Sequence, residues 1–144
     1  YFGGERTPNR PESTGVLRGL RTGTTRNEMA RAYVEGLLCS MKDAVAALEN
    51  ATGVATRRIL LIGGGAQSEA VRRIAPQVFG VAVDVPQPAE YVALGAARQA
   101  AWALSGKEEP PHWDIAAPTR FEAQPRPEIY ARYAELREAT DGWT

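Results

Sequence analysis

Apolar residues recur every three or four positions between residues 26 and 50, which is the spacing of an amphipathic α-helix. Charged residues occupy the opposite side of the same segment. Thr25 and Glu28 have the spacing of a capping box, in which each side chain accepts a hydrogen bond from the other residue's backbone N–H. The pattern predicts a helix of about six or seven turns that ends near Gly53. Its apolar positions are Ala30, Tyr33, Val34, Leu37, Leu38, Met41, Val45 and Leu48.

Two short apolar runs, residues 58–62 (RILLI) and 81–85 (VAVDV), follow this helix. The first is unbroken and rich in branched residues, the pattern of a strand buried on both faces. Each run precedes a helical segment, so strands and helices alternate along the chain. This alternation predicts an α/β fold with a largely parallel central sheet.

Two further helices are expected after these strands. The first begins at Ser68 and runs toward Gly80, with a kink at Pro76. An alanine-rich run over residues 91–104 predicts the second. Small residues in that run allow close helix packing, so we interpret it mainly as core. The alternative is that Gly95 and its neighbours leave room beside a bound nucleotide.

The two ends of the chain are less regular. Residues 1–25 are rich in Gly, Pro, Thr and Arg, and within them residues 14–20 (TGVLRGL) are the candidate for a short strand. The opening residues YFGGERTP read as the end of a strand that runs into a loop, so we expect a piece of a longer protein. Residues 107–127 are proline-rich and predict an extended strap over the surface. A last amphipathic helix is marked by Ile129, Tyr130, Tyr133 and Leu136.

Length and charge limit the classes of protein. The 144 residues suit one domain, and 17 basic residues balance 17 acidic ones without a basic block. This balance argues against nucleic acid as a partner. No apolar run approaches the roughly 20 residues that span a bilayer. We therefore expect no membrane partner and a cytoplasmic location.

Candidates for nucleophilic or metal chemistry are few. Cys39 and His112 are the only cysteine and the only histidine, which excludes an internal disulfide and a Cys/His zinc site. Ser40 lies in no recognisable nucleophile motif. Three acidic residues of the predicted helices are interpreted as solvated charges. They are Asp43, Glu49 and Glu69.

The strongest chemical signal is a run of three glycines, residues 63–65, between the first predicted strand and the next helix. Such a turn presents backbone N–H groups at the start of a helix, where a nucleotide can bind, but glycine also makes plain tight turns. A P-loop is excluded because no lysine follows the glycines. From the local sequence, a nucleotide site and a plain chain reversal stay equally open.

A dinucleotide site is a partial match. Gly63 and Gly65 fit the first two glycines of that fingerprint, and Asp84 ends the next predicted strand about 20 residues later, where an acid binds ribose. Ser68 occupies the third glycine position, however, and a long helix precedes the motif. An oxidoreductase domain is therefore the second hypothesis.

The ordered blocks YFGGERTP, GVLRGL, RAYVEGL, LLIGGGAQSE and ALGAARQAA resemble the C-terminal domain of the FGGY carbohydrate kinases, most closely the xylulokinase branch. The resemblance covers about residues 1–106, and we assign residues 107–144, the strap and last helix, to the same domain. It implies an α/β fold of the actin-like ATPase (ribonuclease H-like) type, with a central mixed sheet flanked by helices. It also implies ATP as the cofactor, with Mg²⁺ held mainly by an N-terminal domain outside this chain.

The resemblance also assigns site residues. The turn that packs against the adenosine would consist of Gly64, Gly65 and Ala66, with Gly63 preceding it, and Ser68 would be the polar residue near the adenine. Gln67 is a further candidate with a looser match. The family's sugar-binding residues, catalytic aspartate and phosphate loop lie in the N-terminal part, which this chain does not contain. The parent protein is therefore expected to phosphorylate a pentulose such as D-xylulose, and the isolated chain is expected to be inactive.

The expected partners are the parent's own N-terminal domain and a sugar in the cleft between the two domains; a homodimer is left open. Glu5 and Arg6 are interpreted mainly as a local loop ion pair, the alternative being an element of that cleft. Pro76, Tyr91 and Val92 depart from the family pattern and leave individual nucleotide contacts open. A third hypothesis is a non-catalytic regulatory or assembly module of the same fold.

Overall fold

The computed structural model describes residues 1–144 with the exception of residues 2, 5, 6, 8, 115 and 144. The interpretation of Glu5 and Arg6 therefore lies outside the described residues. Along the chain the described elements follow the order α1, β1, η1, α2, β2, α3, β3 and α4. None of these helices is long and apolar enough to cross a membrane.

The long helix α1 (Arg26–Thr52) has the ends that the sequence predicts. Thr25 Oγ1 accepts a hydrogen bond from the Glu28 backbone N–H at 3.2 Å, and Glu28 Oε2 accepts one from the Thr25 backbone N–H at 2.7 Å. The hydrogen bond from the Thr25 backbone lowers the pKa of Glu28. At the other end Gly53 has a φ of 68°, a left-handed conformation that glycine adopts without strain.

The apolar face of α1 is only partly used within this chain. Leu38 and Cys39 are fully buried, and Val34 and Val45 pack against the same core. The other apolar positions of the helix stay exposed to solvent. They are Ala30, Tyr33, Leu37, Met41 and Leu48.

The second long helix, α2 (Glu69–Phe79), packs against α1 and supplies much of the core. Two side chains of α1 reinforce this contact: Arg31 donates to Gln77 Oε1 at 2.8 Å, and Lys42 Nζ donates to the Val78 carbonyl at 2.6 Å. The lysine thereby places a positive charge at the carbonyl end of α2, where it is favourable. Pro76 is buried inside the helix, which continues past it.

Three short strands form one mixed sheet in the order β1 (Ile59–Leu60), β2 (Val83–Val85) and β3 (Thr119–Phe121). β1 and β2 are parallel, whereas β2 and β3 are antiparallel. β2 is buried along its length, but Leu60 of β1 is 52% exposed, so the expectation that the first strand is buried on both faces was wrong. About half of the surface of Leu60 is thus open to solvent in this chain.

β3 lies within the proline-rich segment that the sequence predicts as an extended strap, and the sequence did not predict this strand. The strand exists because its backbone pairs with β2: Phe121 lies opposite Val83, and Thr119 lies opposite Val85. Three residues carry too little of a period-two pattern to be recognised from sequence. The strap thus returns to the central sheet.

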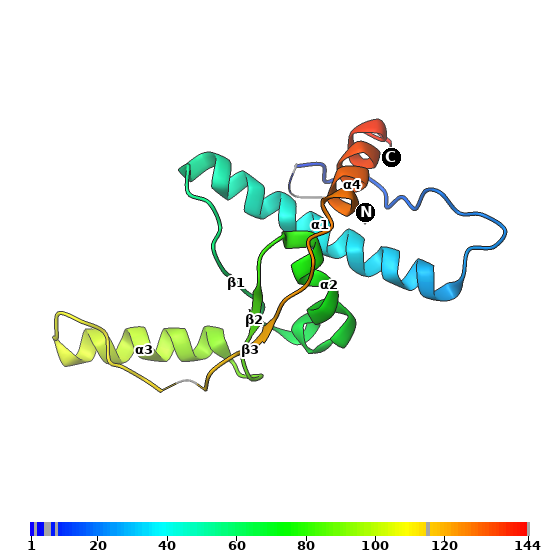
Figure 1. The fold of residues 1–144 in the computed structure, drawn as a ribbon. Helices are drawn as coiled ribbons and strands as arrows, with labels where there is room; N and C mark the ends of the chain where they lie inside the picture. Colours follow the sequence, from blue (N-terminus) through cyan, green and yellow to red (C-terminus); the bar gives the residue numbers. More distant parts are fainter. Residues whose placement is uncertain (2, 5–6, 8, 115, 144) are drawn as a thin grey trace.

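Helix α3 (Tyr91–Ser105) projects away from the rest of the molecule (Figure 1). All of its residues are described, and none of them is buried, so within this chain the interpretation as core was wrong. The chain that follows runs back beside the helix (Figure 1). Arg98 Nε donates to the Pro111 carbonyl and Trp102 Nε1 to the Lys107 carbonyl, each at 2.8 Å.

The last helix, α4 (Pro127–Ala139), packs on α1 and α2. Tyr133 is buried, and Tyr130 and Arg137 both bond to Asp43 of α1. Asp43 is therefore a buried partner, and its interpretation as a solvated charge was wrong. Glu49 also has a structural partner, because its Oε1 accepts a hydrogen bond from the Thr56 backbone at 2.6 Å.

Candidate functional site

The carboxyl ends of the parallel strands β1 and β2 meet at one edge of the sheet. The backbone N–H of Leu61 donates to the Asp84 carbonyl at 2.9 Å, which continues the pairing of the two strands. The three glycines follow β1, and residues 86–91 follow β2. A cavity of about 480 Å³ lies between these two connections. Ligands of open α/β sheets bind at this position, outside the carboxyl ends of the strands.

One position of the glycine turn has a backbone conformation that requires glycine. Gly63 has a φ of 92° and a ψ of −178°, a conformation that is essentially restricted to glycine. The 3₁₀ helix η1 (Gly64–Gln67) begins at the next residue. N–H groups in the first turn of a helix lack an acceptor within that helix, so the backbone of this turn can bind a ligand.

Gly64 and Gly65, unlike Gly63, have no backbone conformation that requires glycine, and the space beside them is empty of other described residues. No atom of the described residues lies within 4 Å of the position that a Cβ would take at either glycine, and neither has a left-handed φ. Their missing side chains are therefore not explained by packing inside this chain. A glycine here allows a ligand to approach the backbone closely.

Helix α2 holds this turn in place. The Arg72 guanidinium Nε donates to the Ala66 carbonyl, and the side chain of Ala66 is buried in the core. The Ser68 backbone N–H donates to the Gly65 carbonyl at 3.2 Å. Ser68 occupies the N-cap position of α2, but its hydroxyl makes no capping hydrogen bond to the described helix. The predicted cap therefore has the expected position without the expected side-chain contact.

The opposite wall of the cavity consists of the connection from β2 to α3. The hydroxyl of Tyr91, the first residue of α3, donates to the Gln87 carbonyl and closes this loop on itself. Pro86 and Pro88 also line the cavity. Pro86, Gln87 and Pro88 carry no motif that predicts a site from the sequence. The signal that identifies them is the parallel order of the two strands, because it places the residues after β2 beside the glycine turn.

The structure divides the predicted site residues into two groups. Gly63, Gly64 and Ala66 line the cavity, as does Gln67. Gly65 and Ser68 belong to the same turn but do not line it. The cavity volume of about 480 Å³ lies in the range of small-molecule sites.

Asp84 does not face this cavity. Its carboxylate is almost completely buried between two arginines, with Oδ2 at 2.6 Å from Arg58 Nε and Oδ1 at 3.6 Å from Arg120 Nη1. Two cations already occupy the acidic group that a dinucleotide site would use for ribose. Asp84 is therefore not available to bind a ribose, and the interpretation of the glycine turn as a dinucleotide site was wrong.

The remaining candidates do not form a second reactive centre. Cys39 is fully buried, and burial, followed by the charges of Glu35 and Asp43, raises the pKa of its thiol to about 12. The Ser40 hydroxyl donates to the Leu37 carbonyl of its own helix. Within the described part of the chain, no three His, Cys, Asp or Glu side chains are arranged to hold a metal ion.

Comparison with known proteins agrees with this geometry. The C-terminal domain of the FGGY family of carbohydrate kinases matches residues 1–104. The xylulose kinase of Streptomyces rubiginosus is 40% identical over 131 residues, and the glycerol kinase of Thermus brockianus is 34% identical over 139 residues. The match covers 89% of this chain for the first and 92% for the second. The chain belongs to the FGGY family of carbohydrate kinases.

The solved structures lead to the same family. The xylulose kinase of Bifidobacterium adolescentis is 50% identical to this chain, covers 92% of it and superposes with a TM-score of 0.77. The fold is thus the actin-like ATPase fold of the FGGY sugar kinases, with a mixed sheet flanked by helices, as the resemblance implied. The chain spans only 26% of that structure and 27% of the Streptomyces relative, about a quarter of each.

Proposed function

We propose that this chain is the nucleotide-binding C-terminal domain of an ATP-dependent carbohydrate kinase whose substrate is a pentulose such as D-xylulose. The observation that carries the proposal is the cavity at the carboxyl ends of β1 and β2, with the open Gly64 beside it. Family membership supports the kinase class over the oxidoreductase class. The xylulose kinases among the relatives support the sugar.

The chemistry of phosphoryl transfer supports a division of labour within the parent. This reaction depends on positioning and on neutralising charge around the transferred group from several directions. In our proposal this chain holds the nucleotide, with Gly63, Gly64 and Ala66 as the surface for adenosine. The Gly65 carbonyl accepts the Ser68 backbone N–H within the turn, and the Ser68 hydroxyl is available to the adenine. The N-terminal domain, the partner within the parent, supplies the sugar site and the catalytic base.

The same reasoning assigns the metal to the rest of the parent. ATP reacts as a magnesium complex, in which the metal neutralises phosphate charge. At the cavity the described residues offer backbone groups, a glycine turn and the carboxylate of Glu90, and no three His, Cys, Asp or Glu side chains among the described residues are arranged to hold a metal ion. We propose that the isolated chain lacks kinase activity for this reason, and that the protein is cytoplasmic, where ATP and sugars are available.

The first experiment compares the parent protein with this chain in an assay of ADP release with Mg·ATP. Xylulose, ribulose, glycerol and gluconate are tested as acceptors. We expect ADP release that depends on xylulose in the parent, and none in the isolated chain. A folded parent that responds to glycerol but not to xylulose would correct the sugar. If no sugar stimulates a folded parent, the kinase assignment fails and a non-catalytic module of the same fold replaces it.

A pair of variants of the parent tests the cavity. Gly64→Val adds a side chain at the cavity wall, in space that the described residues leave empty. Gly23→Val is the matched control, because Gly23 also has empty space around it and an unstrained backbone, but lies outside the cavity. We expect the first variant to raise the KM for ATP roughly tenfold or more. An equal KM for ATP in both variants contradicts the assignment of the cavity to the nucleotide.

A further inference from the structure

Arg72 belongs to helix α2, but its side chain contacts the glycine turn that precedes the helix. Its backbone N–H donates to the Ser68 carbonyl at 3.1 Å, so the residue lies near the N-terminal end of α2. Side chains of an α-helix lean toward the N-terminus of that helix. The guanidinium therefore reaches back past Ser68, and its Nε donates to the Ala66 carbonyl. The last carbonyls of a helix have no donor within it, and this contact satisfies one of those of η1.

The position of this cation is unfavourable for α2 itself. The N-terminal end of a helix carries a partial positive charge, which disfavours an arginine there. Among the described residues the Arg72 guanidinium contacts a single acceptor, the Ala66 carbonyl, and pairs with no acidic side chain. The next residue differs, because Arg73 forms an ion pair of 2.6 Å with Glu69 on the exposed side of the helix. The stability of α2 alone therefore does not explain an arginine at position 72.

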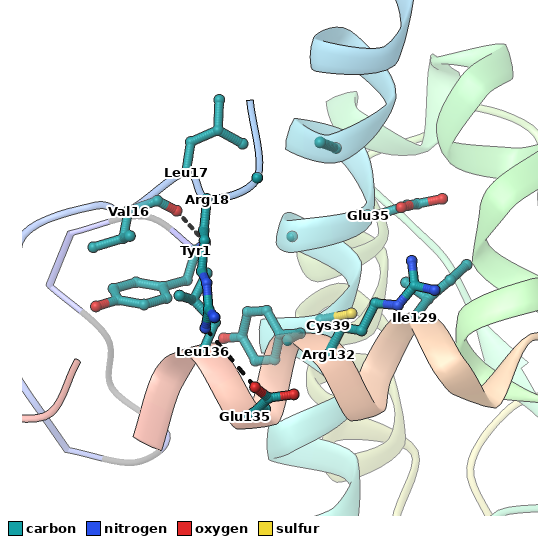
Figure 2. Close-up of a pocket in the computed structure, with 14 residues that line it drawn as sticks. Tyr1, Val16, Leu17, Arg18, Glu35, Cys39, Ile129, Arg132, Glu135 and Leu136 are labelled. Carbon is teal, nitrogen blue, oxygen red and sulfur yellow. Dashed lines mark hydrogen bonds and ion pairs between the residues drawn. The ribbon is translucent and has the colours of Figure 1, made fainter. Parts of the chain in front are cut away.

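An arginine beside another hollow of the molecule shows the contrast. Figure 2 shows this hollow of about 480 Å³, where Arg18 Nη1 lies 3.8 Å from Glu135 Oε1 of α4. Arg18 belongs to residues 14–20, which do not form the short strand that their sequence predicts. The cavity at the glycine turn also has an acidic residue on its wall, Glu90, but within the described part of the chain Glu90 forms no ion pair with Arg72. The partner of Arg72 is thus the backbone of the turn.

The glycine turn has few other contacts that restrict it. Empty space lies beside Gly64 and Gly65 among the described residues, so packing within this chain does not fix them. Glycine also loses more backbone freedom than any other residue when it becomes ordered. Ala66 follows directly, its side chain is buried in the core, and its carbonyl is the atom that Arg72 contacts. The turn is therefore held at Ala66, next to the glycines of the cavity wall.

We propose that Arg72 is a positioning residue of the nucleotide site: its hydrogen bond to the Ala66 carbonyl holds the glycine turn in the shape that receives the nucleotide. The inference rests on the proposed function, because it takes the cavity at Gly64 as the nucleotide site. Arg72 lines that cavity and also borders a second hollow of about 580 Å³ next to Phe121 of β3. With open space on both sides, the hydrogen bond rather than close packing determines where the guanidinium lies. A turn that is ordered before binding costs the complex less conformational entropy.

Matched substitutions at two neighbouring positions of the parent test this role. Arg72→Met keeps a long side chain and a high helix propensity but removes every donor. Arg73→Met makes the same change one residue later, where the arginine contacts Glu69 instead of the turn. Titration calorimetry measures the Kd for Mg·ADP. We expect Arg72→Met to raise this Kd roughly tenfold, and Arg73→Met to leave it within roughly twofold of the native value.

Steady-state kinetics separate positioning from a purely structural role. A hydrogen bond that only stabilised the fold would change the midpoint of urea denaturation without changing the nucleotide affinity of the folded molecules. We expect Arg72→Met to raise the KM for ATP by roughly the same tenfold factor, with much smaller changes in kcat and in the KM for xylulose. Arg72→Lys keeps a charged donor without the planar guanidinium, so its Kd should lie between those of Arg72→Met and the native protein.

Three results overturn the proposal. They are a native Kd for Mg·ADP in a folded Arg72→Met variant, an equal rise of the Kd in Arg73→Met, and a Kd in Arg72→Lys as high as in Arg72→Met. A lower denaturation midpoint together with a native Kd belongs to the first of these results. If Arg72→Met does not fold, Arg72→Ala takes its place with the same expectation.

The same measurements distinguish this inference from the proposed function. A parent that binds Mg·ADP equally well with and without the Arg72 guanidinium keeps the proposed nucleotide site and loses this role of Arg72. A parent whose affinity for Mg·ADP depends on Arg72, but in which no sugar stimulates ADP release, keeps the role and loses the kinase assignment. A folded native parent that binds no nucleotide overturns both.

Discussion

The Tyr130 hydroxyl donates a hydrogen bond of 2.6 Å to Asp43 Oδ1, and this contact joins α4 to the middle of α1 across 87 residues of sequence. Arg137 bonds the second carboxylate oxygen from the same side of α4. Burial opposes the charge of the Arg137 guanidinium, but its hydrogen bonds to Asp43 and Glu138 raise its pKa above the ordinary value. The buried carboxylate is therefore satisfied from one helix, and α4 is fixed to the body of the domain.

Removing the Tyr130 hydroxyl should loosen this attachment. Tyr130→Phe leaves the ring in place but removes one donor to the buried carboxylate, so we expect a loss of about 1–2 kcal/mol in the free energy of unfolding. Urea denaturation measures this loss. Tyr91→Phe is the control, because that hydroxyl donates to Gln87 only four residues away and joins no separate elements. Equal losses in both variants contradict a role of Tyr130 in holding α4.

The same hydroxyl should make stability depend on pH in the alkaline range. Burial, followed by the hydrogen bond to Asp43 and its charge, raises the pKa of Tyr130 to about 12 from an ordinary value of 10.0. The folded state therefore favours the neutral phenol. This contribution is complete below pH 10 and is lost as the pH rises toward 12. The difference in unfolding free energy between the native protein and Tyr130→Phe should shrink over this window; a constant difference contradicts the assignment.

Asp84 should be more important for folding than for ligand binding. The Asp84 carboxylate is buried, whereas the side chains of its two partners, Arg58 and Arg120, are more than half exposed to solvent. Asp84→Asn removes the negative charge of both ion pairs and leaves the two arginines in contact with water. We expect a loss of about 1–2 kcal/mol in unfolding free energy that decreases at high salt. Asp114→Asn is the control, because Asp114 is fully exposed beside His112. Binding of NADH that is lost in Asp84→Asn would restore the dinucleotide interpretation.

Cys39 should be protected from thiol reagents in the folded protein. Its side chain is fully buried and the pKa of the thiol is raised to about 12, chiefly by burial, so thiolate is scarce at neutral pH. We expect labelling by iodoacetamide to be slow in buffer and rapid in denaturing urea. The reagent's rate with free cysteine is measured under both conditions as the control. Rapid labelling of the folded protein would show that α1 separates from the core.

Local signals identified much of this fold from the sequence. Thr25, Glu28 and Gly53 determine the ends of α1 through contacts within a few residues, and the glycine turn follows directly from three adjacent glycines. The features that escaped prediction depend on partners distant in sequence. β3 exists because of β2, and the burial of Asp43 depends on two side chains of α4.

In the candidate site, too, one wall of the cavity follows from local sequence and the other depends on partners distant in sequence. The cavity wall formed by Gly63 and Gly64 can be recognised in the sequence as a glycine motif, because the backbone conformation that requires glycine is a local property. The wall at Gln87 and Tyr91 becomes part of the site only when the parallel pairing of β1 and β2 brings both connections to one edge. A sequence pattern does not record that pairing, so these residues had no local signal.

The adjacent glycines of the turn should respond differently to the same substitution. Gly63→Ala forces a side chain into a backbone conformation at φ 92° that essentially only glycine adopts, so we expect a loss of about 1–3 kcal/mol in unfolding free energy. Gly64→Ala meets no strain and no neighbour among the described residues, so its stability should stay close to that of the native protein. Urea denaturation measures both, and ATP binding to the parent is measured by titration calorimetry. If Gly64→Ala weakens ATP binding without a loss of stability, the glycine at this position serves the ligand; unchanged binding in a stable Gly64→Ala variant means that the nucleotide does not approach this part of the turn.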